Sequence, residues 1–199
     1  MKILLIGAGG TIGSAVDKEL SQRHEVIRIG RNSGDLQVDI SDSASIRKLF
    51  EKTGKFDALV CAAGNVTFAP LGEMTEDSFA LGLKDKLMGQ VNLLLIGREF
   101  ANDGASFTFT TGVLSHDPTA SGASASLVNA ALDGFVRAAA IELPRGMRVN
   151  SVSPTVLEES MGTYAAYFRG FKPISAADAA RAYAKSVEGL QTGRTFHVG

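Results

Sequence analysis

The sequence is poor in the residues that build disulfide frameworks, metal centres and surfaces for polyanions. It has one cysteine, Cys61, and its three histidines, His24, His116 and His197, are far apart along the chain. One cysteine excludes an internal disulfide and is typical of a reducing cytoplasm, and the histidines lack metal-ligand spacing. The formal net charge of -1 gives no electrostatic reason to expect nucleic acid or an anionic membrane as partner. We therefore expect a cytoplasmic protein without a metal site.

Long apolar runs are also missing. The first run, Ile3–Ile6, stops at a glycine cluster and is too short for the apolar region of a secretory signal. The longest apolar stretch, Leu87–Gly97, is too short to span a bilayer. With 199 residues, of which 45% are hydrophobic and 21% charged, the chain has the size and balance of one globular domain. We expect a single domain over residues 1–199 without a membrane segment.

Short apolar runs alternate with helical patterns along the whole chain, and several runs are as apolar as strands buried on both faces of a parallel sheet. Seven strands are predicted, over Ile3–Ile6, Glu25–Ile29, Leu36–Asp39, Ala58–Cys61, Phe107–Thr110, Arg148–Val152 and Thr195–Val198. Helices are predicted over Thr11–Gln22, Ser43–Thr53, Thr75–Phe100, Gly122–Leu143 and Ala176–Leu190. Glycines within the third leave open whether it is one helix or two. The alternation predicts a Rossmann-type α/β domain, a doubly wound parallel sheet with helices on both faces.

A glycine-rich turn follows the first predicted strand and begins the first predicted helix. It reads Gly7-Ala8-Gly9-Gly10-Thr11-Ile12-Gly13. Glycines allow a sharp turn and bring backbone N–H groups close to a pyrophosphate, and the helix N-terminus adds the positive end of its dipole. In strand–turn–helix context this pattern indicates dinucleotide binding, the alternative being a tight turn without a ligand. We expect cofactor contacts from Gly7, Gly9, Gly10, Thr11, Ile12 and Gly13.

The end of the second predicted strand indicates which dinucleotide binds. An NAD site places an acidic side chain there to hold the ribose 2′-hydroxyl, whereas the 2′-phosphate of NADP needs a cation. This chain has Arg31, Asn32 and Ser33 at that point and no acidic residue. A guanidinium matches the geometry of a phosphate, and Asn32 and Ser33 can donate further hydrogen bonds. The prediction is NADP(H) in preference to NAD(H), and the alternative is that Arg31 is a solvated surface residue.

Taken in order, these features resemble the short-chain dehydrogenase/reductase superfamily over essentially the whole chain. Residues 7–13 resemble the family's glycine motif. Asp39-Ile40 resembles its acidic-apolar pair, which cups the adenine, and Cys61-Ala62-Ala63-Gly64 resembles its Asn-Asn-Ala-Gly segment. Segments 130–135, 148–154 and 192–198 resemble the elements that follow the family's active site. The resemblance implies further cofactor contacts from Asp39, Ile40, Ala62, Ala63, Gly64, Pro154 and Val156.

The catalytic residues of this family are only partly matched. The family's serine falls at Thr111, which keeps the hydroxyl, but its Tyr-x-x-x-Lys pair falls at Ala125 and Asn129. The tyrosine of that pair transfers a proton to or from the substrate oxygen, which alanine cannot do. The family's structural asparagine falls at Lys86, so lysine and asparagine have exchanged places. We expect Thr111, Lys86 and Asn129 as catalytic residues, the alternative for Lys86 being a solvated helix position.

Other side chains are candidates for the missing proton donor, namely Ser126, His116, Tyr164 and Tyr167, although packing or loop roles are commoner for such residues. The leading hypothesis is an atypical NADP(H)-dependent oxidoreductase that transfers hydride to or from a small carbonyl or alcohol substrate, covered by a short lid at about residues 155–174. The alternative is a non-catalytic NADP(H)-binding or redox-sensing protein. Apolar, small-residue helices near 87–100 and 122–143 and the family resemblance imply a homodimer or homotetramer.

Overall fold

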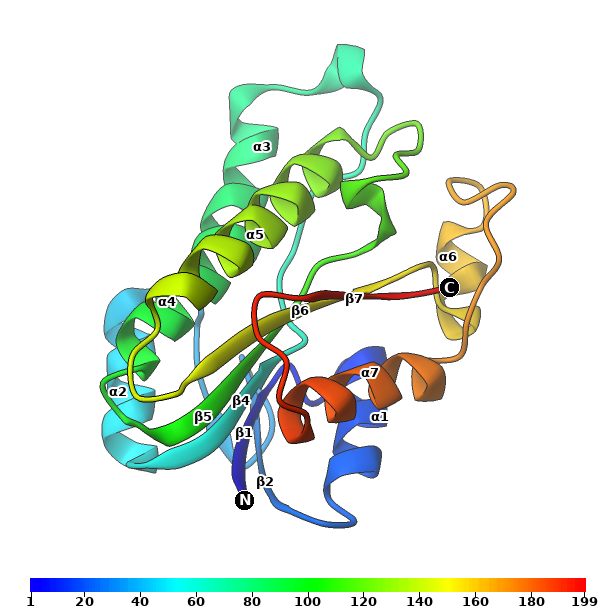
Figure 1. The fold of residues 1–199 in the computed structure, drawn as a ribbon. Coiled ribbons are helices and arrows are strands. Elements are labelled where there is room, and N and C mark those ends of the chain that lie inside the picture. Colours follow the sequence, from blue (N-terminus) through cyan, green and yellow to red (C-terminus); the bar gives the residue numbers. More distant parts are fainter.

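Apolar residues occupy consecutive positions in the central strands, so helices must cover both faces of the sheet. In the computed structural model, which describes residues 1–199, seven parallel strands form one sheet in the order β3-β2-β1-β4-β5-β6-β7 (Figure 1). The strands are β1 (Lys2–Ile6), β2 (Glu25–Gly30), β3 (Leu36–Gln37), β4 (Phe56–Cys61), β5 (Ala101–Thr110), β6 (Arg148–Pro154) and β7 (Thr195–Val198). The order reverses between β1 and β4, and the predicted doubly wound Rossmann-type sheet is confirmed.

Helices lie on both faces of this sheet (Figure 1). One face is covered by α1 (Thr11–Leu20) and α7 (Ala176–Glu188), the other by α2 (Ser43–Thr53), α4 (Gly89–Gly97) and α5 (Ala123–Glu142). The remaining helical elements are α3 (Glu76–Gly82), α6 (Met161–Tyr164), a π-helical turn (Leu83–Met88) and 3₁₀ turns at Leu71–Glu73, Val113–Ser115 and Glu158–Ser160. No helix combines the length and the apolar character needed to cross a membrane.

The two-residue period of the strands divides the apolar side chains between two hydrophobic layers. In β1, Leu4 and Ile6 pack into the layer under α2, α4 and α5, whereas Ile3 and Leu5 pack into the layer under α1 and α7. All four side chains are essentially inaccessible to water. The register of β1 therefore decides which apolar side chains of this strand pack against which helices. The same register fixes the position of the glycine turn that follows Ile6.

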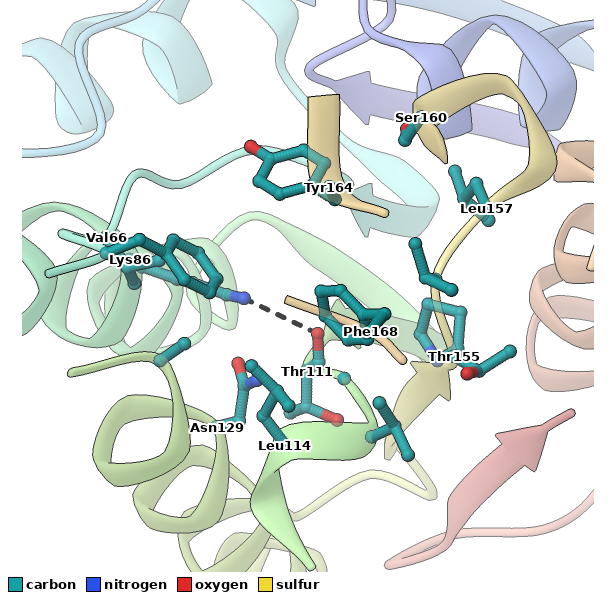
Figure 2. Close-up of a pocket in the computed structure, with 16 residues that line it drawn as sticks. Val66, Lys86, Thr111, Leu114, Asn129, Thr155, Leu157, Ser160, Tyr164 and Phe168 are labelled. Carbon is teal, nitrogen blue, oxygen red and sulfur yellow. Dashed lines mark hydrogen bonds between the residues drawn. The ribbon is translucent and has the colours of Figure 1, made fainter. Parts of the chain in front are cut away.

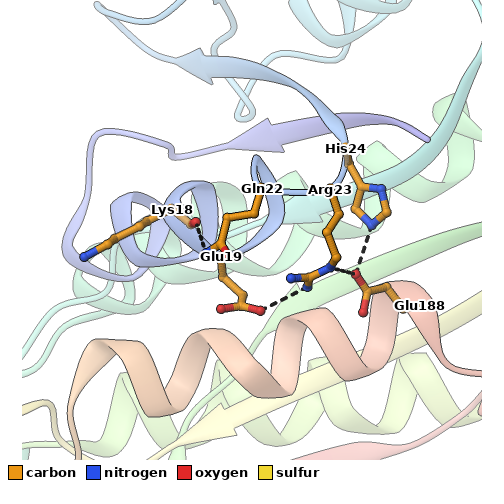
Figure 3. A network of polar contacts seen from close by, with 6 residues as sticks. All are labelled: Lys18, Glu19, Gln22, Arg23, His24 and Glu188. Carbon is orange, nitrogen blue, oxygen red and sulfur yellow. Dashed lines mark hydrogen bonds and ion pairs between the residues drawn. The ribbon is translucent and has the colours of Figure 1, made fainter.

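Charged side chains also join α1 to α7 where the chain enters β2 (Figure 3). Arg23 donates hydrogen bonds to Glu19 and Glu188, and the His24 ring nitrogen Nε2 lies 2.9 Å from Glu188 Oε1. Burial alone would raise the pKa of Glu188, but the hydrogen bonds from Arg23 and His24 outweigh it and lower that pKa. This network lies at the amino end of β2, at the opposite end of the strand from the glycine turn.

The predicted helix over Thr75–Phe100 is helical from Glu76 to Gly97, and its unexpected feature is a π-helical turn in the middle. Its residues form α3, the π-helical turn and α4 in succession, so neither glycine inside it ends the helical path. A Cβ at Gly82 would lie 3.0 Å from Ser124 Oγ, and one at Gly89 would lie 2.9 Å from Ile40 Cγ1. The two glycines therefore permit close approach to α5 and to the segment after β3.

Element boundaries differ at several other points. The predicted strand Leu36–Asp39 is only two residues long, because Asp39 already turns away and bonds Ser41. Strand β5 begins at Ala101 rather than Phe107, with an irregularity in its pairing to β4 near Phe56. The short α6 and the 3₁₀ turns were not predicted, because segments of three or four residues carry no periodic pattern.

Candidate functional site

The glycine turn after β1 is built by packing that only glycine permits. Gly7 has φ +84°, and a Cβ there would lie 2.7 Å from the carbonyl oxygen of Ala62. A Cβ at Gly13 would overlap the carbonyl oxygen of Gly7. The N–H groups of Gly9, Thr11 and Ile12 donate no hydrogen bond within the protein. Unpaired N–H groups at the start of a helix are suited to an anionic ligand.

A small pocket of about 60 Å³ lies beside this turn, between the carboxyl ends of β1, β2 and β4. The pocket brings together five residues predicted from sequence to bind the cofactor: Gly7, Arg31, Ile40, Ala63 and Gly64. Its other walls are Ile6, Gly30, Val38, Asn65 and Asp85. Four apolar side chains thus share this small pocket with the polar groups of Arg31, Asn65 and Asp85, a mixture that can receive an apolar ring and bind its polar substituents. We refer to it below as the β2 pocket.

Arg31 contacts two carboxylates at the β2 pocket. Its Nη2 lies 3.4 Å from Asp39 Oδ1 and 3.5 Å from Asp85 Oδ2. Hydrogen bonds from the hydroxyl and N–H of Ser41 lower the pKa of Asp39, so that carboxyl group is ionised at neutral pH. The sequence shows no acidic residue at the end of β2, but the π-helical turn brings one from a distant segment. Arg31 is therefore not the unpaired cation that the sequence alone indicates.

The other predicted cofactor residues lie in three places. Ser33 is next to the glycine turn, because its Oγ would be 3.5 Å from a Cβ at Gly9. Asn32 is exposed and makes no hydrogen bond within the protein. Pro154 and Val156 line a second, larger pocket at the end of β6, separate from the β2 pocket.

This second pocket, which we call the β6 pocket, has a volume of about 190 Å³ (Figure 2). It contains all three predicted catalytic residues, Thr111, Lys86 and Asn129, and also Ala125. Ser160, Tyr164 and Phe168, from the segment after β6, form part of its wall. Its remaining lining is Val66, Phe68, Gly112, Val113, Leu114, Pro154, Thr155, Val156 and Leu157. A mostly apolar pocket thus encloses one cation and a few hydroxyl and amide groups.

Lys86 points into the β6 pocket and donates from Nζ to the backbone carbonyl of Thr111 at 3.4 Å (Figure 2). Its side chain is half-buried overall, but protein atoms surround the ammonium, and burial lowers its pKa to about 8. Gly64 holds the stem of this lysine, because a Cβ at Gly64 would lie 2.6 Å from Lys86 Cγ. The hydroxyl of Thr111 donates instead to the carbonyl of Val152 at 3.4 Å. Lys86 therefore meets the main chain of Thr111, not its hydroxyl.

Asn129 contributes an incompletely bonded amide to the same pocket. The residue is 3% exposed, and its Oδ1 has no hydrogen-bond partner. A Cβ at Gly112 would lie 3.1 Å from Asn129 Nδ2, so the amide packs against the turn that follows Thr111. A buried acceptor without a partner is costly, which favours a water molecule or a ligand beside it.

Comparison with known proteins places the chain in a family. Residues 10–190 match the family described as enoyl-(acyl carrier protein) reductase. The chain belongs to the short-chain dehydrogenase/reductase superfamily of oxidoreductases. L-xylulose reductase of Bos taurus is 26% identical over an alignment of 185 positions, and the match covers 81% of this chain and 73% of that protein.

Two solved structures are close to this one. The protein lin1944 from Listeria innocua is 52% identical, with a TM-score of 0.99 and 100% of both chains covered. A small-chain dehydrogenase solved in complex with NADPH is 26% identical, with a TM-score of 0.88, and the match covers 100% of this chain and 96% of that one. The recognition of the superfamily from sequence is confirmed.

Among the candidate proton donors of this short-chain dehydrogenase/reductase, only Tyr164 lines the β6 pocket. Tyr167 packs against Phe68 with ring centroids 5.7 Å apart, and His116 is exposed and packs against His197. Ser126 does not line the pocket, although its Oγ is buried without a partner. The position of the family tyrosine, Ala125, is a 3% exposed part of the pocket wall.

Gln90 is a site residue that the sequence analysis missed. Its side chain is fully buried, accepts a hydrogen bond from the N–H of Thr110 at 2.9 Å, and donates to the carbonyls of Thr110 and Lys86 at 3.2 Å each. It therefore joins the π-helical turn to the last residue of β5, directly before Thr111. Its polar side chain in the largely apolar segment 89–97, which it shares only with Asn92, is the only sequence signal for this role.

We expect Gln90→Leu to loosen this junction. Leucine has a similar volume but leaves the N–H and carbonyl of Thr110 without partners, at a cost of about 1–3 kcal/mol for each buried group. Urea unfolding should show a lower free energy of unfolding, whereas Asn92→Leu, on the same helix and with one hydrogen bond to Ser43, should change it by less than about 1 kcal/mol. Equal stability of the two variants would contradict the role assigned to Gln90.

Proposed function

We propose that the protein is an NADP(H)-dependent oxidoreductase of atypical active site, which transfers hydride between the nicotinamide and a small carbonyl or alcohol substrate. The observation that carries the proposal is the grouping of Lys86, Thr111 and Asn129 in one mostly apolar pocket near a glycine turn with unpaired N–H groups. The NADPH complex of a 26% identical small-chain dehydrogenase supports the cofactor class.

The residues present fit a nicotinamide dinucleotide. The N–H groups of Gly9, Thr11 and Ile12 would bind the pyrophosphate, and the β2 pocket, walled by Ile40 and Ala63, would receive the adenosine end. The unpaired amide oxygen of Asn129 is suited to accept a hydrogen bond at the other end. When bound, the cofactor supplies or accepts the hydride, and the protein binds, orients and excludes water.

Lys86 takes the part of the family's missing lysine in this proposal. Its ammonium lies in a pocket with apolar walls, where a cation stabilises negative charge on a substrate oxygen more strongly than in water. Its contact with the Thr111 carbonyl is long, at 3.4 Å, so an incoming oxygen can replace or share it. The proton then comes from a water molecule or from a hydroxyl of the segment at 155–174 that lines the pocket, where Tyr164 is the proton donor expected from sequence. That segment would act as the substrate lid.

A second candidate function is supported by Ala125. An alanine in place of the family's proton donor is what a non-catalytic NADP(H)-binding or redox-sensing protein would tolerate. A sensing role through Cys61 is disfavoured, because burial raises the pKa of its thiol to about 12 and leaves no thiolate at neutral pH. Turnover of a carbonyl and alcohol panel with NADPH and NADP separates the enzyme from the sensor.

Lys86→Ala should lower NADPH-dependent carbonyl reduction by at least about a hundredfold, the scale of losing one preorganised electrostatic group. NADP binding should fall far less, because the phosphates and the adenosine are held elsewhere. Lys84→Ala, an exposed lysine on the same turn, is the matched control and should retain activity. An active wild type with an equally active Lys86→Ala variant would refute the role of this lysine while leaving the enzyme assignment intact.

The pH profile of this activity should report the same lysine. Because the pKa of Lys86 is lowered to about 8, the ammonium is present below that pH and is lost as the pH rises through it. Reduction should therefore decline above about pH 8. In Lys86→Arg the guanidinium stays protonated, so any remaining activity should lack this decline. A wild-type rate that stays flat from pH 7 to pH 10, over about three pH units, would argue against a titrating ammonium.

Arg31 should favour NADP(H) over NAD(H). A charge-assisted hydrogen bond to a phosphate contributes about 1.5–3 kcal/mol, which predicts at least about tenfold tighter binding of NADP(H). Arg31→Ala should remove most of that difference, as measured by isothermal titration calorimetry with both cofactors. Equal affinities in the wild type would remove the basis for the preference.

We further propose a two-fold homodimer or a homotetramer built on α4 and α5. These helices leave Leu95, Leu127 and Ile141 exposed, and Ile141 is 86% exposed. Burying such side chains between two copies is favourable, and a two-fold axis would place the same pair of helices on both sides. Light scattering at micromolar concentration should give at least twice the 20.9 kDa mass of one chain. A monomer would refute the assembly without affecting the site.

A further inference from the structure

Asp85 is a buried acidic residue whose carboxylate is only partly satisfied by its neighbours. It lies on the π-helical turn, lines the β2 pocket, and its side chain is 6% exposed. Its Oδ2 accepts a hydrogen bond from Asn65 Nδ2 at 2.6 Å, whereas its Oδ1 has no partner. The only cation that pairs with it is Arg31, at 3.5 Å. Asn65 and Arg31 pair only one oxygen of this buried carboxylate, and the other oxygen is left without a partner at a cost in free energy that packing alone does not explain.

The same arginine is the residue to which the 2′-phosphate of NADP would bind. A carboxylate accepts hydrogen bonds but donates none, so Asp85 can bind a ribose hydroxyl and must repel a phosphate. In NAD the group at this position is a hydroxyl, and in NADP it is a phosphate. The carboxylate of Asp85 beside Arg31 should therefore favour the binding of NAD and weaken the binding of NADP.

Asp39 cannot take this role in the same way. Its Oδ1 already accepts hydrogen bonds from both the N–H and the hydroxyl of Ser41, in addition to the contact with Arg31. Its side chain is also 46% exposed, where water screens its charge. Asp85 differs in both respects, because it is buried and one of its oxygens is unused.

We propose that Asp85 is a specificity-determining residue that limits the preference for NADP(H) by competing with the 2′-phosphate for Arg31 and by accepting a hydrogen bond from the ribose of NAD(H). The proposal rests on the nicotinamide-cofactor function proposed above and adds the residue that sets the choice. It requires that Arg31 turn from Asp85 toward the 2′-phosphate of NADP, and that binding of NAD open a path for the ribose hydroxyl to the unpaired oxygen of Asp85, which is buried in the structure. Asp85 lies on the π-helical turn and not at the end of β2, where an NAD site has its acidic residue.

The test is the ratio of the dissociation constants for NAD and NADP in Asp85→Asn, measured by isothermal titration calorimetry. The two cofactors differ only in the 2′-phosphate, so a general loosening of the pocket changes both constants and cancels in the ratio. Asparagine keeps the shape of aspartate but removes its charge. We expect NADP to bind more tightly, NAD to bind more weakly, and the ratio to shift toward NADP by about tenfold, the scale of one charge-assisted hydrogen bond.

Asp77→Asn is the matched control. It makes the same change in net charge on the adjoining α3, where Asp77 is exposed and forms no ion pair, so the ratio should stay within about twofold of wild type. Thermal unfolding of both variants verifies that they are folded. If Asp85→Asn is not folded, Asp85→Ser removes the same charge with a smaller side chain and should shift the ratio in the same direction.

The outcomes separate this proposal from the one on which it depends. A wild type that binds either cofactor, with the same ratio in Asp85→Asn, overturns the role of Asp85 and leaves the proposed function standing. A ratio that moves toward NAD, or an equal shift in Asp77→Asn, also overturns it. A wild type that binds neither cofactor removes the proposed function, and the role of Asp85 with it.

Discussion

The chemistry at both pockets depends on the hydrogen bonds of one buried amide, Gln90. This side chain joins the end of β5 to the π-helical turn at 83–88, and so fixes the height and rotation of that turn over the carboxyl ends of the strands. Asp85 and Lys86 are consecutive residues of the turn, and they line different pockets. A π-helical turn changes the direction of side chains relative to an α-helix, and such turns are frequent at functional sites. One junction thus positions a carboxylate at the β2 pocket and an ammonium at the β6 pocket.

Gly64 keeps the two charges in separate surroundings. It lines the β2 pocket, and its lack of a side chain admits the stem of Lys86 at a distance that a Cβ would forbid. The positive φ of Gly64, +135°, is also one that other residues rarely adopt. The backbone at Gly64 therefore lies between the β2 pocket and the stem of Lys86, and it carries no side chain that would block the lysine. Lys86 can reach the second pocket only because this position of the family's segment after β4 remains glycine.

The sequence predicts those parts of the structure that depend on neighbouring residues better than those that depend on contacts between distant segments. The parallel sheet, its helices and the glycine turn follow from short-range patterns, such as the uninterrupted apolar run of β1 and the glycines directly after it. The grouping of Thr111, Lys86 and Asn129 was implied by the family resemblance, since these residues are far apart in sequence. No local pattern predicts that Asp85 meets Arg31, because that contact depends on how the π-helical turn lies against β2. For this reason the absence of an acidic residue at the end of the second predicted strand did not reveal that Arg31 would have an acidic partner.

The exchange of lysine and asparagine has a physical consequence beyond their identities. A lysine on the π-helical turn approaches Thr111 from the side of β4 and Gly64, whereas a lysine at position 129 would approach from α5. Asn129 is 3% exposed and has an unpaired amide oxygen, so a full charge at that position would also be buried and costly. The exchange therefore moves the cation from α5 to the π-helical turn and leaves a neutral amide on α5. With alanine at position 125, the space next to Asn129 is apolar, and the cation at Lys86 becomes the main electrostatic feature that a substrate oxygen in this pocket would meet.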